Sequence, residues 1–336
     1  MTPEDAFRKL SSANAGYAVG LGWCQGSAKP QIMANGPLWR GASQMVRPDA
    51  RWHIGSITKT ITATLAMREV DQGRLGLDAP IGPVLQDAAS LHESWKSVTL
   101  RQLLSHTSGL PANPPLRLLL QWRDMGTEEG LRKVLQTVWD KPLKGKPGQY
   151  RYSNLGFMLV GLMLEKATGR PWETLVREEI ATPLGLESLG FGPPQGQSDP
   201  KGHRRLLFWS TPKERDDLTA DNPRWLGPAG TVHMSLPDLL TYGRAHLQAG
   251  RGDLPSFLSQ QSALAMRAPI GTDYGLGFVL QKDAMWHDGS NTMWYALLII
   301  DPVSDAVVVA AQNTSKGAMR MGRVLQKTVE ALRTGE

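Results

Sequence analysis

The stretch RWHIGSITKTITATLAMREVDQG, residues 51–73, marks a change from strand-like to helical patterning. From position 57 onward its apolar residues recur at near-helical spacing, at Ile57, Ile61, Leu65 and Val70. Gly73 follows this pattern directly and is the type of residue that ends helices. Ser56 and Lys59 stand at the start of the helix and lie one turn apart on the same face. The stretch therefore predicts a helix that opens on a Ser-x-x-Lys pair.

The Ser-x-x-Lys pair has two interpretations. In the structural one, Ser56 caps the helix and Lys59 is a solvated surface residue, since this spacing occurs by chance in many proteins. In the catalytic one, Ser56 is a nucleophile near the positive end of the helix, and Lys59 takes its proton. A lysine can act as that base only where a dry cleft favours its neutral form. A P-loop is excluded, because Thr58 stands where that pattern requires a glycine.

The sequence on either side of this helix predicts a mixed fold. Strand patterns lie near the chain ends, at residues 16–26, 36–45 and in four segments of residues 274–315. The four last segments have short connections, which indicates an antiparallel meander, and an amphipathic helix closes the chain. The middle is mostly helical, and YSNLGFMLVGLMLEKATG is apolar nearly all round, as in a buried helix. We predict an α/β fold of the α+β type, with a central antiparallel sheet from both chain ends flanked by helices.

The strands at both ends imply a discontinuous division of the chain. We expect residues 1–75 and 255–336 to form an α/β lobe, and residues 76–254 to form a mostly helical lobe. Within the helical lobe, TLRQLLSHTSG is predicted as a helix that Gly109 ends, and residues 192–228 as a long surface excursion. Sites often lie where two such lobes meet, so we expect one catalytic unit with its site between them.

A second pattern, Tyr152-Ser153-Asn154, stands at the entrance to the predicted buried helix. By itself it fits a capping residue beside a packing tyrosine. Together with the Ser-x-x-Lys pair it gains a chemical interpretation, because a lysine cation nearby would favour the phenolate of Tyr152. Such a tyrosine could move protons between the serine, the leaving group and water.

A third stretch, AMWHDGSNTMW at residues 284–294, places His287 and Asp288 beside Gly289. It fits a tight turn, part of a metal site, a Ser/His/Asp hydrolase or one wall of an active site. A triad of the α/β-hydrolase type requires Gly-x-Ser-x-Gly, which does not occur. The seven histidines show no metal-binding spacing and Cys24 is the only cysteine, so we expect neither a metal nor another cofactor. Two other histidines are expected to serve in helix capping and in packing, namely His106 and His53.

These motifs, in this order, resemble those of the serine β-lactamase and penicillin-binding-protein superfamily. The resemblance is closest to the branch of class C β-lactamases, D-alanyl-D-alanine peptidases and related esterases. It rests on Ser-x-x-Lys, Tyr-x-Asn and a His/Lys-x-Gly strand, with support from GRLGLDAPI, VTLRQLLSHTSGLP and GPAGTVHMSLPDLLTYG. It runs from about residue 15 to about residue 330. It implies an α/β lobe with a central antiparallel sheet, together with a helical lobe.

The resemblance also implies roles for individual residues. Ser56 corresponds to the nucleophile that forms an acyl-enzyme, and Lys59 to its activating partner. Tyr152 corresponds to the general acid/base that also helps water to attack. Backbone N–H groups of the nucleophile and of the residue after the glycine would form the oxyanion hole. The implied substrate-binding and oxyanion residues are Asn154, His287, Gly289 and Ser290.

The strand element at His287 departs from the best-known family pattern. β-Lactamases and transpeptidases usually carry Lys-Thr-Gly there, and that lysine is a permanent cation facing the substrate carboxylate. An unperturbed histidine is mostly neutral at pH 7, and Asp288 adds a negative charge unless strand alternation points it away. We therefore expect a carboxylesterase with weak or no β-lactamase activity. The alternatives are a β-lactamase or D-alanyl-D-alanine carboxypeptidase, and a catalytically silent binding or sensor module on the same fold.

Composition limits the classes of partner. The chain has 336 residues, a net charge of +6 and scattered Lys and Arg, which indicates a mildly basic surface rather than a nucleic-acid footprint. The longest apolar run, near Leu155 to Leu164, is too short for a transmembrane segment. The opening MTPEDAFRKL has no signal pattern, so we expect a cytoplasmic protein, or a periplasmic one if a signal peptide has been removed. The expected partner is a small-molecule ester, amide or β-lactam substrate, and the oligomeric state stays open.

Overall fold

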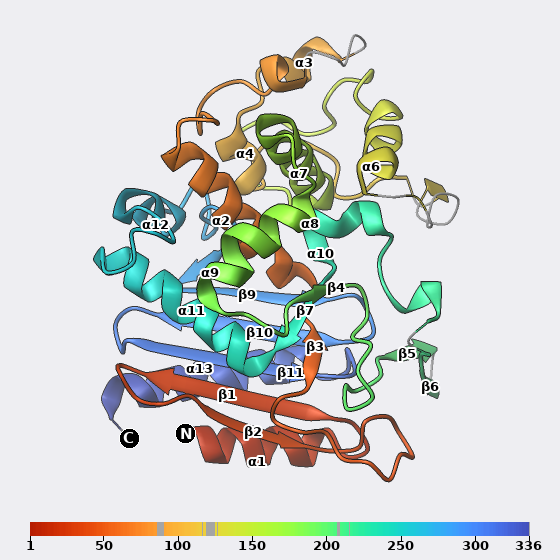
Figure 1. The fold of residues 1–336 in the computed structure, drawn as a ribbon, viewed down its shortest axis with the longest axis vertical. Helices are drawn as coiled ribbons and strands as arrows, with labels where there is room; N and C mark the ends of the chain where they lie inside the picture. The colour runs from red at the N-terminus through yellow and green to blue at the C-terminus, as the bar shows by residue number, and fades with distance from the viewer. Residues whose placement is uncertain are drawn as a thin grey trace.

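A six-stranded antiparallel sheet forms the core of the molecule, in the order β2-β1-β11-β10-β9-β8 (Figure 1). The computed structural model describes residues 1–85, 91–115, 117, 118, 125, 127–206, 209–214 and 216–335. The strands of the sheet are β1 (Val19–Gln25), β2 (Gln31–Asn35), β8 (Val279–Gln281), β9 (Ala284–Ser290), β10 (Tyr295–Asp301) and β11 (Ala306–Gln312). The two chain ends meet where β1 pairs with β11. The predicted α/β fold with an antiparallel sheet from both ends is therefore confirmed.

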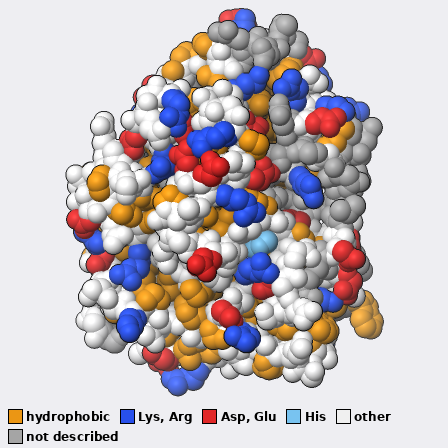
Figure 2. Space-filling model, in the orientation of Figure 1, with side chains coloured by type: hydrophobic (Ala, Val, Ile, Leu, Met, Phe, Trp, Pro, Cys, Tyr) orange, Lys and Arg blue, Asp and Glu red, His pale blue; other side chains and the backbone are white. Residues whose placement is uncertain are grey.

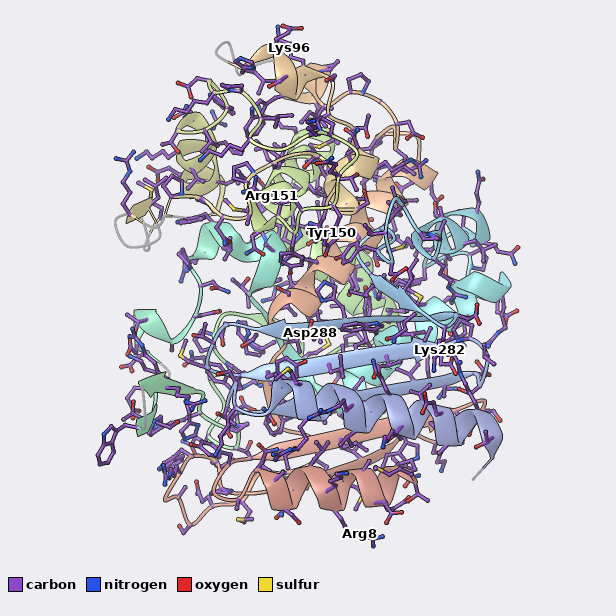
Figure 3. The ribbon with its side chains drawn as sticks, turned by 180° about the vertical axis from the view of Figure 1, so that it is seen from behind. Arg8, Lys96, Tyr150, Arg151, Lys282 and Asp288 are labelled. Carbon is purple, nitrogen blue, oxygen red and sulfur yellow. The ribbon has the colours of Figure 1, made fainter. Side chains whose placement is uncertain are left out.

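Helices cover both faces of this sheet. Helices α1 (Pro3–Ala13) and α13 (Ala318–Thr334) pack on one face, and Figure 3 shows both in front of the strands. Helix α11 (Leu236–Arg251) packs on the other face, against β1, β10 and β11. Strands β10 and β11 are buried along their whole length, because neither face of the sheet meets water there.

The remaining helices lie mostly above the sheet in Figure 1, around α2 (Thr58–Asp71) and α7 (Asn154–Thr168). All ten residues from Leu155 to Leu164 of α7 are buried, so the predicted buried helix is confirmed. The others are α3 (Glu93–Lys96), α4 (Leu100–Leu104), α6 (Thr127–Gln136), α8 (Trp172–Leu175), α9 (Thr182–Leu184), α10 (Gly227–Gly230) and α12 (Gln260–Met266). Short helical turns are η1 (Gly55–Ile57), η2 (Gly82–Leu85), η3 (Val176–Ala181), η4 (Leu218–Ala220) and η5 (Arg224–Leu226).

The structure describes two smaller sheets in addition to the central one. Strand β7 (Val232–Ser235) pairs with β3 (Arg51–His53) on one side and β4 (Gly190–Phe191) on the other. Strand β3 leads directly into η1, so this sheet fixes the start of the Ser-x-x-Lys element. Strands β5 (His203–Leu206) and β6 (Trp209–Pro212) form a separate hairpin.

Three local predictions differ from the structure. The second predicted strand, residues 36–45, is wrong: the strand is β2, and Gly36 with φ of 101° turns the chain away after it. Helix α4 ends at Leu104 rather than near Gly109, because the chain leaves helical geometry at the next two residues. The segment 192–228 is not confined to the surface, since Asp221 and Trp225 within it are buried.

The predicted boundaries between the lobes stay a prediction. Helix α11 lies inside the range 76–254 that was assigned to the helical lobe, yet it packs on the central sheet. Strand β7 belongs to the same range and pairs with β3. These contacts favour moving residues 232–251 to the α/β lobe.

The surface shows no dominant charge on the face drawn in Figure 2, where acidic and basic side chains are interspersed. Large exposed apolar residues, such as Trp209 and Met319, belong to separate elements of the chain. Within the described part of the chain, no helix combines the length and apolar character that crossing a bilayer requires.

Candidate active site

Ser56 and Lys59 are brought into direct contact at the junction of η1 and α2. Lys59 Nζ lies 2.9 Å from Oγ of Ser56 and donates to the carbonyl oxygen of Ala229 at 2.6 Å. The Lys59 side chain is 0% exposed. Burial holds its pKa well below the ordinary value of 10.5, and the negative charge of Asp288 opposes this shift only in part. A neutral amine at this position can accept the proton of the Ser56 hydroxyl.

Lys59 is dry because α2 is buried nearly all round. Helix α2 carries threonines where a surface helix would carry charges, and these side chains find partners inside the molecule. Thr62 donates to the carbonyl oxygen of Pro228 at 2.7 Å, and Thr64 donates to that of Thr60 at 2.8 Å. The helix can therefore be enclosed without leaving these hydroxyl groups unpaired. This enclosure is what distinguishes Lys59 from a solvated helix lysine.

Tyr152 lies beside the same pair, just before α7. Lys59 Nζ is 4.9 Å from the centroid of its ring. Burial raises the pKa of Tyr152 far above its ordinary value of 10, and a hydrogen bond with Ser56 only partly opposes this rise. The sequence suggested a phenolate stabilised by a lysine cation. The structure instead favours a neutral phenol, because desolvation raises the pKa of Tyr152 and lowers that of Lys59. Such a phenol can donate a proton to a leaving group.

His106 forms hydrogen bonds with the residues on both sides of Tyr152 in the chain. Its carbonyl oxygen accepts the N–H of Arg151 at 2.7 Å, and its Nδ1 accepts the N–H of Ser153 at 3.1 Å. The ring centroids of His106 and Tyr152 lie 4.3 Å apart. Burial holds the pKa of His106 well below its ordinary value. His106 therefore acts as a neutral support for Tyr152 and adopts a left-handed φ of 60° after α4.

Asn154 is the first residue of α7, and Ser153 caps that helix by accepting the N–H of Gly156 at 3.0 Å. The Asn154 side chain donates to Oδ1 of Asn113 at 2.6 Å, and its backbone N–H donates to the carbonyl oxygen of Ala112 at 2.8 Å. The loop that contains Asn113 therefore holds Asn154 at the start of α7. Its expected role in orienting Lys59 and a substrate amide stays a prediction.

The end of β9 forms the wall opposite Ser56. Strand β8 pairs only with residues 284–286, so β9 leaves one edge without a neighbouring strand at residues 287–290. Element η1 lies against this edge: a Cβ built on Gly289 would overlap the carbonyl oxygen of Ile54 and lie 2.5 Å from the nitrogen of Ser56. A Cβ built on Gly55 would lie 2.8 Å from Cα of Ser290. Only glycines permit this approach, which brings the backbone at Ser56 close to the backbone at Ser290.

His287 and Asp288 point to opposite faces of β9. His287 is 2% exposed, and its Nδ1 donates to the carbonyl oxygen of Asp288 at 2.6 Å. Its Nε2 is left as an acceptor for the hydroxyl of Tyr274 at 3.1 Å. Burial and the charge of Lys59 lower the pKa of His287, so it adds no cation to this wall. Asp288 lies on the α13 side, where it accepts the Tyr295 hydroxyl at 3.0 Å (Figure 3).

Comparison with known proteins bears on this site. The family model described as Beta-lactamase matches residues 32–332. Penicillin-binding protein 4 of Amycolatopsis lactamdurans is 30% identical over 85% of this chain and 77% of its own length. D-alanyl-D-alanine-carboxypeptidase/endopeptidase AmpH of Escherichia coli K12 is 30% identical over 61% of this chain and 51% of its own length. Esterase EstB of Burkholderia gladioli is 32% identical over 47% of this chain and 43% of its own length.

The fold has close counterparts among solved structures as well. The octameric penicillin-binding protein homologue from Pyrococcus abyssi matches with a TM-score of 0.80 at 20% identity, over 99% of this chain and 76% of that one. The family model covers most of the chain, and the sequence motifs agree with it. The resemblance noted in the sequence is confirmed: the chain belongs to the Beta-lactamase family of serine hydrolases.

Proposed function

We propose that the protein is a carboxylesterase that works through an acyl-enzyme on Ser56. Ser56 Oγ attacks the ester carbonyl carbon while Lys59 takes the hydroxyl proton. The N–H groups of Ser56 and Ser290 stabilise the developing oxyanion, with about 3 kcal/mol from each donor. Tyr152 donates a proton to the leaving oxygen as the carbon–oxygen bond breaks, which yields the alcohol, and Lys59 passes the serine proton to Tyr152. Water then attacks the acyl-serine carbonyl and gives a proton to the Lys59–Tyr152 pair. The pair returns a proton to Ser56 Oγ as the bond to the acyl group breaks, which releases the acid.

The observation that carries this proposal is the contact between Lys59 and Ser56. A serine hydroxyl needs a base, and here the buried amine lies 2.9 Å from it. Burial already lowers the pKa of Lys59, so the amine can be neutral before substrate arrives. A purely structural lysine would gain nothing from this enclosure, because burying a charge costs free energy.

The preference for neutral esters follows from the β9 wall. A carboxylate-bearing substrate needs a cation opposite Ser56, and His287 is buried there with both ring nitrogens bonded. An ester without a carboxylate needs only the two N–H groups and an apolar surface. Similarity to esterase EstB supports this reading.

The first test is covalent labelling of the nucleophile. We expect a fluorophosphonate to label the wild-type protein with a stoichiometry near one, and Ser56→Ala to remove the label completely. Peptide mass spectrometry locates the adduct. Labelling that persists in Ser56→Ala would place the nucleophile elsewhere. A wild-type protein that neither reagent class, fluorophosphonate or labelled penicillin, can acylate would indicate a silent binding or sensor module.

A D-alanyl-D-alanine carboxypeptidase is the second candidate. The similarity to AmpH and to penicillin-binding protein 4 favours it. The chain also offers a different cation, because Arg151 is exposed next to Tyr152, and Figure 3 shows Arg151 and Tyr150 together above the strand that carries Asp288. A guanidinium can bind a carboxylate through two hydrogen bonds.

A substrate panel separates the two candidates. The panel contains p-nitrophenyl esters, a chromogenic cephalosporin, and D-Ala-D-Ala peptides with a free carboxylate or a carboxamide end. The carboxylesterase proposal predicts high kcat/KM on the esters and little turnover of the rest. If the free-carboxylate peptide is cleaved best, and Arg151→Ala lowers its kcat/KM by about tenfold without affecting the carboxamide peptide, the carboxypeptidase is correct. Strong cephalosporin hydrolysis with negligible ester activity would contradict the carboxylesterase.

A further inference from the structure

A buried polar network lies behind η1, and the reaction proposed above does not use it. His53 ends β3 and is 0% exposed, Asp221 follows η4, and Asn291 follows β9. All three are buried, although they come from segments far apart in the chain. Buried polar side chains cost free energy unless they are paired, so this network requires a function in the fold or in the site.

The hydrogen bond from Gly55 to the His53 ring fixes the position of the His53 proton. The N–H of Gly55 donates to Nδ1 at 3.1 Å, so Nδ1 is an acceptor. Nε2 therefore carries the proton, and it lies 2.7 Å from Oδ1 of Asp221 without the alignment of a hydrogen bond. The pair resembles the His–Asp half of a hydrolase triad. The Nδ1 lone pair that would accept the serine proton already accepts the N–H of Gly55. His53 is therefore not free to act as the base for Ser56.

Asp221 connects this histidine to the other side of the site. Its Oδ1 also accepts the side-chain N–H of Asn291 at 3.1 Å and the backbone N–H of Asn222 at 2.6 Å. Asn291 Oδ1 accepts the N–H groups of Met293 and Trp294 at 3.2 Å each, which shapes the turn between β9 and β10. The network thus spans from the residue before Ser56 to the residue after Ser290.

Two further contacts close the network. The Trp294 ring stacks on His53 with 5.8 Å between the centroids, so the β9–β10 turn packs directly on the imidazole. The Asn222 side chain donates to the carbonyl oxygen of Gly230 at 2.9 Å, next to Ala229, the acceptor of Lys59. Both N–H donors and the lysine acceptor are therefore connected to one buried carboxylate.

We propose that His53, Asp221 and Asn291 form a positioning network that aligns the N–H groups of Ser56 and Ser290 on the substrate oxygen. This inference rests on the proposed role of Ser56. Gly55 has φ of 51°, a conformation open to several loop geometries, and the bond from its N–H to His53 selects one of them. Alignment of the two donors stabilises the transition state more than the bound ester, so the network should affect acylation rather than ester binding.

The test measures the rate constant of acylation by a p-nitrophenyl ester in the pre-steady state, together with KM. We expect His53→Ala to lower the acylation rate constant by about 10- to 100-fold, with KM within about twofold of wild type. We expect His53→Asn to recover part of the loss, because the asparagine Oδ1 can still accept the Gly55 N–H. A structural role alone would not give this rescue or this separation of kcat from KM.

The matched control is His233→Ala. His233 is the cross-strand neighbour of His53 in the β3–β7 pair, is also buried, and bonds through Nδ1 to the carbonyl oxygen of Gly192 at 2.8 Å. Its loss leaves a similar cavity in the same sheet without a direct bond to Gly55. We expect a comparable decrease in Tm and acylation kinetics close to wild type. Equal kinetic losses in the two histidine variants would overturn the proposal.

A double-mutant cycle keeps the test decisive if one variant folds poorly. We expect Asp221→Ala to slow acylation as much as His53→Ala does. The double variant should be no slower than either single variant, because both substitutions disrupt the same network. Additive losses, or Asp221→Ala acylating like wild type, would refute the network. These outcomes are separate from failure of the proposed function, which would appear as a wild-type protein without an acyl-enzyme at Ser56.

Discussion

Replacement of Lys59 by methionine is expected to slow acylation of Ser56 by about 10²- to 10⁴-fold, which is the range that general-base catalysis supplies. Methionine has nearly the length of lysine and fits an apolar enclosure, so the change removes the base with little loss of packing. The buried Lys59 amine lies 2.9 Å from Ser56 Oγ and is the one base that the Ser-x-x-Lys pair contains. The rate constant of the p-nitrophenol burst measures this step directly, and KM should change much less.

The pH dependence of acylation and of stability tests the same role of Lys59. Because the pKa of folded Lys59 lies well below 10.5, the wild-type acylation rate should rise as Lys59 loses its proton and reach a plateau well before pH 10.5. Between the folded pKa and 10.5 the unfolded chain binds a proton that the folded chain does not, so the free energy of unfolding rises with pH. The rise of the acylation rate with pH and the rise of the free energy of unfolding with pH should both be absent in Lys59→Met.

Lys201→Met is the matched control, because Lys201 also lies over an aromatic ring, with its Nζ 4.8 Å from the centroid of Trp39. It should keep the wild-type burst and its pH profile. A Lys59→Met protein that acylates at a tenth of the wild-type rate or faster would show that another group takes the serine proton.

Replacement of Gly289 by alanine is expected to lower kcat by about 10²- to 10³-fold, the cost of losing one oxyanion donor. The new Cβ would overlap the carbonyl oxygen of Ile54 and lie 2.5 Å from the nitrogen of Ser56. These are backbone atoms, so no change of rotamer relieves the clash, and β9 must separate from η1. The N–H groups of Ser56 and Ser290 would then no longer donate together to the carbonyl oxygen of the ester.

The steady-state kinetics of a p-nitrophenyl ester measure this effect, with circular dichroism to show that the variant is folded. Gly322→Ala is the control, since Gly322 lies in α13 and a Cβ there meets no atom within 4 Å. That change should leave kcat unaltered and add about 0.5–1 kcal/mol to the free energy of unfolding. A folded Gly289→Ala protein with kcat within threefold of wild type would contradict the oxyanion role of this strand.

The sequence was sufficient to predict the family, the fold class and the contact between Ser56 and Lys59. The contact between Ser56 and Lys59 depends on local spacing alone, because residues three apart at a helix start lie on one face regardless of the rest of the chain. The buried helix α7 was equally predictable, since its apolar residues surround the whole helix. The meander of β8 to β11 followed from short connections between strand patterns.

Other features depend on contacts between distant segments and could not be predicted. The acceptor of Lys59 is a backbone carbonyl at Ala229, which leaves no trace in residue type. His106 looked like a helix cap, yet its bonds to the neighbours of Tyr152 come from a loop 47 residues further along the chain. Asp221 lies in a segment rich in Gly, Pro and charge that predicts a surface loop. The neutral state of Tyr152 likewise follows from burial, which spacing does not reveal.

The half-paired strand β9 has a consequence for the tendency of the protein to aggregate. An unpaired strand edge is a template to which other chains can add, and natural proteins conceal such edges. Here the concealment is provided by η1, whose backbone lies against residues 289 and 290. The backbone groups at residues 289 and 290, which we propose to face the substrate, would become an exposed strand edge if η1 moved away from β9. Changes that loosen η1 from β9 should therefore promote aggregation as well as inactivation.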